Sequence, residues 1–159
     1  GHLEPGCHGL ETLAMSHIGG GIRLHVSVVL IREGLLLVVE EAKPENYGKW
    51  NLPGGHLEEN ETILEGGLRE ALEETELSVT LTSLLGVYRT HRSGYQAARF
   101  VLRAEGSGEP VAGDQILSIR WATLEEIEAR EDSLCVGGLK KIARDAFTSQ
   151  SFPLETLRD

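Results

Sequence analysis

One segment constrains the fold and chemistry of this chain more than any other: residues 62–75, which predict an amphipathic helix with an acidic side. At about 100° per residue, Glu70, Glu73 and Glu74 fall within one narrow arc. Three neighbouring carboxylates repel one another by roughly a few tenths of a kcal/mol per pair in an isolated helix. The acidic side is therefore either fully solvated or lies against a divalent cation, since Mg²⁺ prefers carboxylate oxygens and water. The opposite side, which should be buried, carries Leu64, Leu68, Ala71, Leu72 and Thr75.

The residues before this helix bear on whether its acidic side is solvated or binds a cation. Gly54 and Gly55 have no Cβ, so their backbone can turn tightly and approach a ligand or a metal closely. Glu61 would lie near the helix N-terminus, where the helix dipole favours a carboxylate. A glycine pair often marks only a turn, and an amphipathic helix often has a solvated acidic side. Both interpretations, a solvated helix and a cation site, are open on these residues alone.

The remaining hydrophobic pattern predicts one α/β (α+β) domain. Glu33 and Gly34 predict a tight turn between two apolar strands, and Pro53 with the glycine pair should end a short strand that begins at Trp50. Thr123 opens a capping box and with it a short helix. Antiparallel hairpins with helices between them favour a mixed sheet sandwiched between helices over a Rossmann unit. Strands are expected over residues 22–31, 35–39, 50–52, 77–88, 98–104 and 116–121, and a further helix over 136–147.

The composition excludes two broad classes of function. The 159 residues contain 15 Lys and Arg against 25 Asp and Glu, which gives a formal net charge of −10. A chain this acidic does not attract nucleic-acid phosphates through its overall field, so general DNA or RNA binding is not expected. No apolar run approaches the roughly 18 residues of a membrane span, so no membrane association is expected. Cys7 and Cys135 form no metal-binding or redox spacing, which favours a reduced, cytoplasmic protein.

The chain divides into a central domain and two flanking segments. Residues 1–21 lack periodicity and begin with Gly1 and His2, which resemble the remnant of a protease site, so we exclude this N-terminal extension from fold reasoning. Residues 22–150 contain the predicted strands and helices without repeats or linker-like stretches, and are expected to form one domain. Residues 151–159 are expected to be a C-terminal tail.

Residues 55–77 resemble the Nudix box of the Nudix hydrolase family. The family pattern is Gly, five residues, Glu, seven residues, Arg-Glu, an aliphatic residue, any residue, Glu-Glu, any residue, Gly and an aliphatic residue. The sequence Trp50-Asn51-Leu52-Pro53-Gly54 also resembles the segment that precedes the box in this family. The resemblance implies a Nudix fold along most of residues 22–147. The matching positions are Gly55, Glu61, Arg69, Glu70, Ala71, Glu73, Glu74 and Leu77.

Carried over by position, the resemblance assigns a metal site and a reaction. Glu70, Glu73 and Glu74 would be ligands of Mg²⁺ or Mn²⁺, with the carbonyl of Gly54 as a further ligand. Arg69 would pair with a glutamate of the box such as Glu61 and orient the helix, so that these charged residues form the catalytic set. The implied activity is Mg²⁺-dependent hydrolysis of a phosphoanhydride in a small nucleoside di- or triphosphate or a related diphosphate.

Two positions depart from the family pattern. Glu76 replaces the glycine expected at the helix end, where a left-handed residue other than Gly costs about 1 kcal/mol. Gln115 stands where many members have an acidic residue that serves as base or metal ligand, and an amide is a poor proton acceptor near neutral pH. Asp114, Glu105 and Glu109 are the possible substitutes, so the identity of the base is open. The alternative to an active hydrolase is a catalytically impaired Nudix-fold domain that binds or senses nucleotides.

Two glycines lie within the predicted helix, and the substrate is specified less closely than the family. Gly66 and Gly67 each weaken the helix by roughly 0.5–1 kcal/mol relative to Ala, which close approach of another element or of a phosphate would explain. Dispersed segments, among them residues 25–28, 36–41, 48–58 and 152–155, resemble the family branch that hydrolyses nucleoside di- and triphosphates and the pyrophosphate of a thiamine-pathway hydroxymethylpyrimidine. An RNA-end or dinucleoside polyphosphate hydrolase would need a longer basic groove. Both monomers and homodimers occur in the family.

Candidate contacts for such a substrate are cations and aromatic residues along the strands and loops. Arg99 ranks first, because it lies mid-strand among apolar residues and would need an anion if it pointed into a cleft. Each of the others is more often a surface cation or a packed aromatic residue. The phosphate candidates are Arg99, Arg89, Lys49 and Arg23, with Arg92 as a further cation, and the stacking candidates are Tyr47, Trp50 and Tyr95.

Overall fold

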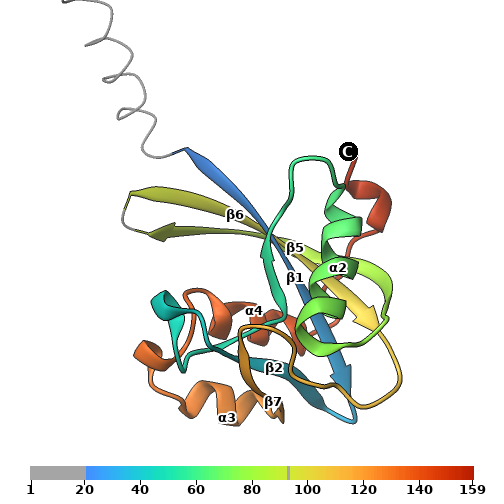
Figure 1. Ribbon diagram of the computed structural model, residues 1–159. Helices are drawn as coiled ribbons and strands as arrows, with labels where there is room; N and C mark the ends of the chain where they lie inside the picture. Colours follow the sequence, from blue (N-terminus) through green and yellow to red (C-terminus); the bar gives the residue numbers. More distant parts are fainter. Residues whose placement is uncertain (1–20, 93) are drawn as a thin grey trace, which may run out of the picture.

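The computed structural model describes residues 21–92 and 94–159 (Figure 1). The expectations for residues 1–20, Cys7 included, lie outside this range. The strands of the described part are β1 (Ile22–Arg32), β2 (Leu35–Glu41), β3 (Trp50–Asn51), β4 (Gly54–His56), β5 (Thr80–Arg92), β6 (Tyr95–Glu105) and β7 (Ile116–Ala122). Its α-helices are α2 (Ile63–Thr75), α3 (Leu124–Ala129) and α4 (Leu139–Ala146), with 3₁₀ turns at Pro44–Asn46, Asp132–Leu134 and Leu154–Thr156.

The strands form a mixed sheet with the order β3-β2-β1-β6-β5, in which β4 also pairs with β1 and β7 with β2. β1 and β6 run parallel from the pair Ile22–Gln96 to the pair Leu30–Ala104. The remaining strand pairs within this sheet, such as β5 with β6 and β2 with β7, are antiparallel. The fold class expected from the sequence, a mixed sheet between helices, is confirmed.

Helices cover both faces of the strands β1, β6 and β5. On one face, Ala71 of α2 packs with Val28, and Ile63 packs with Val26 and Leu102. On the other face, α4 buries Leu139, Ile142 and Ala143 against Leu85 and Val101, in a core that also contains Trp50 and Ile127. In Figure 1, α2 accordingly lies to one side of the sheet, and α3 and α4 lie to the other with β2 and β7.

Helix α2 buries a different side from the one that the sequence predicts. Ala71 and Thr75 are buried as expected, but Leu68 and Leu72 are wrongly predicted and are 42% and 51% exposed. The buried residues instead include Glu70 and Glu74, with 7% and 4% of their surface accessible. Two of the three glutamates on the side that sequence periodicity marks as acidic therefore face the interior of the molecule, whereas the side chain of Glu73 is exposed.

The two glycines inside α2 explain this rotation. A Cβ on Gly66 would lie 2.5 Å from Leu57 Cδ2, and a Cβ on Gly67 would lie 2.8 Å from Leu102 Cδ1. The helix therefore contacts its neighbours along its glycine side, and the close approach of other elements is the reason for both glycines. Turning the helix to bury Leu68 would place larger side chains where Gly66 and Gly67 now contact Leu57 and Leu102.

The C-terminal end of α2 also serves to position a loop. Glu76 adopts the left-handed conformation, with φ of 57°, and its N–H donates to the carbonyl of Leu72, so the helix ends where the sequence predicts. The carbonyls of Glu74 and Thr75 accept hydrogen bonds from the N–H groups of Gly113 and Val111, at 3.0 and 2.8 Å. The loop that carries residue 115 is thereby attached to the acidic helix.

The sequence prediction misses strand β4. Pro53 and the glycine pair were expected to end a strand, yet Gly54–His56 pairs antiparallel with β1, in the register Ser27–Gly54 and His25–His56. The glycine pair, expected to form a turn, thus forms extended backbone between β1 and α2. This placement brings the two glycines directly against the acidic side of the helix.

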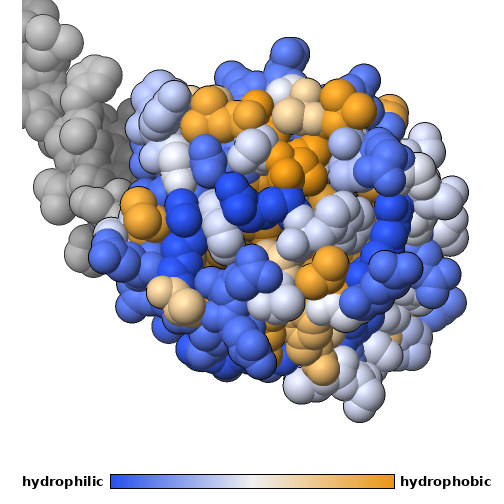
Figure 2. All heavy atoms as spheres, turned by 90° about the horizontal axis from the view of Figure 1, so that it is seen from below, coloured by the Kyte–Doolittle hydropathy of each residue, from blue (hydrophilic) through white to orange (hydrophobic). Residues whose placement is uncertain are grey.

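The surface shows no broad apolar area on the face drawn in Figure 2. Hydrophobic residues there lie in separate groups among hydrophilic ones. Over the described part of the chain, the exposed large apolar side chains belong to several different elements, and include Ile22, Leu72, Val87, Leu117 and Phe152. Among the same residues, none of the helices has the length and apolar character needed to cross a membrane.

Candidate functional site

The site is built where helix α2 meets strand β4. The N–H of Gly54 donates to Glu74 Oε1 at 2.8 Å, so the carboxylate of the helix is bonded to the strand. A Cβ on Gly55 would lie 2.6 Å from Glu70 Oε1, so only glycine leaves space for that carboxylate. The glycine pair therefore lets two buried carboxylates lie directly against the backbone, as the second sequence interpretation requires.

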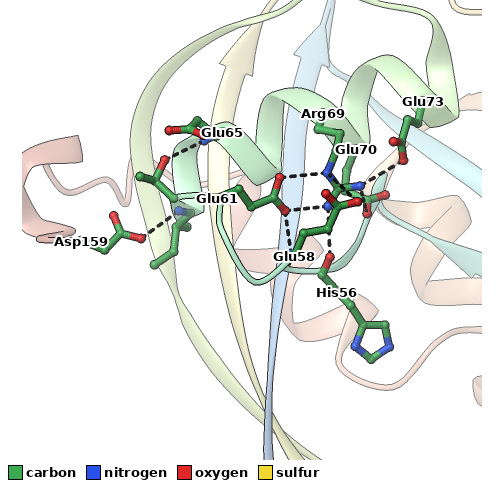
Figure 3. A network of polar contacts seen from close by, with 10 residues as sticks. His56, Glu58, Glu61, Glu65, Arg69, Glu70, Glu73 and Asp159 are labelled. Carbon is green, nitrogen blue, oxygen red and sulfur yellow. Dashed lines mark hydrogen bonds and ion pairs between the residues drawn. The ribbon is translucent and has the colours of Figure 1, made fainter.

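Arg69 connects the glutamates of this region into one network (Figure 3). Its Nε and Nη2 donate to the two oxygens of Glu61 at 2.9 and 2.7 Å, and this bidentate pair joins the two residues whose pairing the family resemblance implies. Its Nη1 donates to Glu70 Oε1 at 2.9 Å and to Glu73 Oε2 at 3.0 Å, and Nη2 also donates to the carbonyl of His56. The hydrogen bond from Arg69 lowers the pKa of Glu61. One guanidinium thus fixes the start of the helix, strand β4 and two carboxylates relative to one another.

The buried carboxylates carry more negative charge than their surroundings balance. Burial, together with the nearby charges of Glu41 and Glu70, raises the pKa of Glu74 to about 8, against the hydrogen bond from Gly54 and the charge of Lys43. Burial also raises the pKa of Glu70, although Arg69 acts in the opposite direction. Carboxylates whose charged form is disfavoured by burial and by one another would be stabilised by a cation.

The donor chemistry of these residues fits a divalent cation such as Mg²⁺. The available ligands are carboxylate and backbone oxygens, which hard cations prefer. Across residues 21–92 and 94–159, no three Asp, Glu, His or Cys side chains are already gathered in a way that would hold a metal. The side chain of Glu73 is 56% exposed and bonded to Arg69, which also binds Glu70. The site therefore offers the right atoms, with two of its carboxylates engaged by the arginine.

An acidic cavity adjoins this side of the helix. Lys43 supplies a cation to its lining, and Gln115 adopts the left-handed conformation with φ of 62°. The backbone carbonyl of Gln115 accepts a hydrogen bond from the N–H of Ala42, which holds this loop against the end of β2. Glu105 and Glu109 are exposed and lie outside the lining, whereas Asp114 belongs to it. The residues that line the acidic cavity are Lys43, Glu70, Glu73, Glu74, Asp114 and Gln115.

A second pocket, which we call the Arg99 pocket, has Gly54 in its lining and shares Lys43 with the acidic cavity. Arg99 is buried, its Nε donating to Ser27 Oγ at 2.8 Å and its Nη2 donating to Asn51 Oδ1. Asn51 Nδ2 in turn donates to Glu41 Oε1 at 2.9 Å. The pocket is lined by His25, Ser27, Glu41, Lys43, Glu45, Asn46, Asn51, Gly54, Gly55, His56, Thr90, Tyr95, Arg99, Val136 and Gly137.

The other predicted substrate contacts are dispersed. Arg23 is exposed with its guanidinium 4.1 Å from the ring centre of Tyr95, which does line the Arg99 pocket. Arg89 is exposed on β5, in a separate groove, and Lys49 lies half-buried in the loop before β3. None of these three cations belongs to the lining of the acidic cavity or of the Arg99 pocket.

The aromatic residues predicted to stack on a base also lie in different places. Tyr47 is exposed, whereas Trp50 is buried in the core, with the guanidinium groups of Arg120 and Arg130 at 4.9 and 4.2 Å from its ring. The side chain of Arg92 lies outside the described residues. Of the aromatic candidates, Tyr95 is the one that the described structure places in the Arg99 pocket.

The pocket residues that were not predicted as site residues from the sequence include Glu41, Lys43 and Asn51. A signal for Glu41 was present, because it is a carboxylate at the buried end of the apolar strand β2, at the alternate position after Leu37 and Val39. Lys43 follows two residues later in what the sequence predicts only as a polar loop, and Asn51 is hidden in the short strand before Pro53.

Comparison with known proteins places this geometry in a family. Residues 21–136 match the NUDIX domain. The chain belongs to the Nudix family. A solved Nudix hydrolase from Nitrosomonas europaea is similar to it with a TM-score of 0.79 and 26% sequence identity, over 86% of this chain and 96% of that one. The expectation of a Nudix-type hydrolase is thereby confirmed at the level of the family.

Curated relatives align with different portions of this Nudix chain. A MutT-like protein of Streptomyces ambofaciens is 36% identical over 106 residues, which are 66% of each protein. The 8-oxo-dGDP phosphatase NUDT18 of Danio rerio is 38% identical over 91 residues, 54% of this chain and 27% of that protein. Phosphatase NudJ of Shigella sonnei is 29% identical over 141 residues, 85% of this chain and 91% of that protein. The chain thus spans about two thirds of the MutT-like protein and about a quarter of NUDT18.

Proposed function

We propose that this chain is a Mg²⁺-dependent pyrophosphohydrolase, with Mn²⁺ as an alternative cation, that cleaves a phosphoanhydride of a small nucleoside di- or triphosphate or a related diphosphate. The observation that carries the proposal is the pair of buried carboxylates, Glu70 and Glu74, held against the Gly54-Gly55 backbone beside a cavity. Buried carboxylates without a matching number of cations are costly in a purely structural role.

In this proposal Glu70, Glu73 and Glu74, with the carbonyl of Gly54, hold the cation. When bound, a divalent cation neutralises charge on the phosphate oxygens and lowers the pKa of an attacking water. Arg69 orients Glu70 and Glu73 through its hydrogen bonds, and its bidentate pair with Glu61 keeps the guanidinium in place. Lys43, in the lining of the acidic cavity, supplies positive charge to the phosphates.

The proton acceptor in this proposal is a carboxylate that lines the acidic cavity. Gln115 also lines it, but an amide does not accept a proton usefully near neutral pH. Asp114 is adjacent and lines the same cavity, whereas Glu105 and Glu109 lie outside it, so Asp114 is the first candidate outside the helix. Asp114→Asn should then lower kcat with little change in KM, and a variant with wild-type kcat would return the role to a glutamate of the helix.

The relatives support the substrate class. NUDT18 is an 8-oxo-dGDP phosphatase, and the NudJ phosphatase aligns with most of this chain. The two adjoining pockets agree with a substrate in two parts, a diphosphate at the acidic cavity and a group of different chemistry in the Arg99 pocket. We therefore place the phosphates beside α2 and the remainder of the substrate beside Arg99.

The test is the release of phosphate and pyrophosphate from a panel of nucleoside di- and triphosphates, nucleotide sugars, ADP-ribose and a hydroxymethylpyrimidine pyrophosphate. Each compound is incubated with Mg²⁺ and, in parallel, with EDTA. Turnover that EDTA abolishes supports the proposal, and the products identify the bond that is cleaved. No turnover, together with saturable binding of the same compounds, would instead support the catalytically impaired binding domain.

A further inference from the structure

One carboxylate of the Arg99 pocket is held firmly but has a free oxygen. Glu41 is 2% exposed, and its Oε1 accepts a hydrogen bond from Asn51 Nδ2 at 2.9 Å. Its Oε2 is buried and, among the described residues, has no hydrogen-bond partner. Buried polar atoms are nearly always paired, and a buried acceptor without a donor is costly. A ligand that supplies the missing donor would explain why this one persists.

Hydrogen bonds hold the backbone of Glu41 and its partner Asn51 in place. The backbone N–H of Glu41 donates to the carbonyl of Lys49 at 2.9 Å, and its carbonyl accepts from the N–H of Gly48 at 2.8 Å. Asn51 Oδ1 accepts from the N–H of Leu52 and from Arg99, so the amide of Asn51 is oriented from both ends. Asn51 therefore presents an N–H to Glu41 Oε1, and Oε2 is left as the carboxylate oxygen without a donor among the described residues.

Glu41 acts on Glu74 of the acidic helix through its charge, but it lines a different pocket. Glu41 lines the Arg99 pocket and is absent from the lining of the acidic cavity, while Lys43 belongs to both. A substrate with its phosphates beside α2 would pass Lys43 and place its remaining part at Glu41. Tyr95 lines the same pocket and offers an aromatic face.

We propose that Glu41 Oε2 accepts a hydrogen bond from an N–H group of a nitrogen heterocycle in the substrate, so that the Arg99 pocket selects nucleotides whose base carries an amino donor. The inference rests on the proposed function for the placement of the phosphates. The shared chemistry is an amino group on a planar ring, which purines and pyrimidines both supply. A site built to hydrogen-bond a substrate N–H rejects the analogue that lacks it, because the buried acceptor is then left unpaired.

The experiment measures equilibrium binding of matched nucleoside monophosphates in EDTA by titration calorimetry. Monophosphates contain no phosphoanhydride, so binding is measured without turnover and independently of the proposed hydrolysis. The pairs differ in one amino group: guanosine against inosine monophosphate, adenosine against purine riboside monophosphate, and cytidine against its 4-deamino analogue. We expect the amino member of at least one pair to bind about tenfold or more tightly, and the pair concerned identifies the base.

The variant Glu41→Gln tests the residue itself. Because Asn51 presents an N–H, the glutamine oxygen must face Asn51, and its NH₂ then faces the ligand and repels an amino donor. The preference should fall below about threefold, with the unfolding temperature measured alongside. The matched control is Glu40→Gln, since Glu40 lies on the opposite side of the same strand and outside the pocket lining, and this variant should keep the wild-type preference.

Three results would overturn the inference. Equal affinities within every pair for the wild-type protein would do so without any variant. An unchanged preference in Glu41→Gln would show that another group reads the base. If Glu41→Gln bound all six ligands more weakly by the same factor and kept the preference, Glu41 would only maintain the shape of the pocket.

Discussion

Removing the charge of Glu74 should make the metal-free protein more stable at alkaline pH. Burial raises the pKa of Glu74 from 4.5 to about 8, so the folded chain retains a proton that the unfolded chain has lost. The stabilisation from this proton is complete below pH 4.5 and disappears as the pH rises to about 8. At about 1.4 kcal/mol per pH unit, the free energy of unfolding falls by on the order of 4–5 kcal/mol over this interval.

The substitution Glu74→Gln isolates this effect. Glutamine has nearly the same shape, stays neutral at every pH, and its carbonyl can still accept the hydrogen bond that Gly54 donates at 2.8 Å. In EDTA at pH 8 the variant should therefore be more stable than the wild-type protein by roughly 2–4 kcal/mol, and at pH 5 the two should differ by less than about 1 kcal/mol. Water that enters the cavity would reduce the stability difference at pH 8 toward the lower end of its range.

The assay is urea unfolding in EDTA at several pH values from 5 to 8, followed by tryptophan fluorescence. Glu65→Gln is the matched control, because it removes one carboxylate from an exposed position of the same helix. Mg²⁺ at pH 8 should raise the stability of the wild-type protein and not that of Glu74→Gln, since binding to the folded state alone stabilises it. Parallel pH profiles for the wild-type protein and Glu74→Gln would refute the electrostatic account of this site.

Three further substitutions test how the site is supported. Gly55→Ala places a Cβ 2.6 Å from Glu70 Oε1, so turnover should fall about tenfold or more, while urea unfolding shows a loss below roughly 2 kcal/mol. Arg69→Lys cannot form the bidentate pair with Glu61, so kcat/KM should fall about tenfold, and an unchanged value would remove Arg69 from the positioning role. Thr123→Ala removes the cap bond to Glu126 N–H and should lower stability by about 1 kcal/mol in urea titrations, with turnover unchanged.

Much of the fold could be predicted because its elements carry local signals. The apolar strands on both sides of Glu33 and Gly34, the capping box at Thr123 and the length of helix α2 all appear in the structure as expected. The end of the helix at Glu76 could also be predicted, because the left-handed position is fixed by where the helical pattern stops. Hydrophobic periodicity and capping chemistry act within a few residues, so the sequence contains them directly.

The orientation of α2 could not be predicted, because it depends on what the helix packs against. Periodicity favours burial of Leu68 and Leu72, but Gly66 and Gly67 allow a closer approach along another side. Helix propensity and amphipathicity describe the helix alone, whereas the sheet decides which side becomes buried. Strand β4 was missed for the same reason, since Gly54 has low strand propensity and is held there by pairing with β1.

The candidate site likewise contains residues that local sequence reveals and residues that only the tertiary fold brings together. The box glutamates and Arg69 are close in sequence, so a resemblance in spacing locates them together. Glu41, Asn51 and Arg99 come from three different strands and meet only through the tertiary fold. No local pattern links such residues, and of the three only Arg99 was predicted as a site residue from the sequence. The clustering of the box glutamates around Arg69 could thus be predicted, and most of the Arg99 pocket could not.

The measurement that tests the central claim most directly is turnover of the preferred nucleotide by the wild-type protein, Glu74→Gln and Glu65→Gln with Mg²⁺. If the carboxylates of α2 hold the cation, Glu74→Gln should lose at least about a hundredfold in kcat while remaining folded, and Glu65→Gln should retain wild-type turnover. EDTA should abolish the activity of the wild-type protein. A folded Glu74→Gln variant with near-full turnover would contradict the assignment of this helix as the metal site.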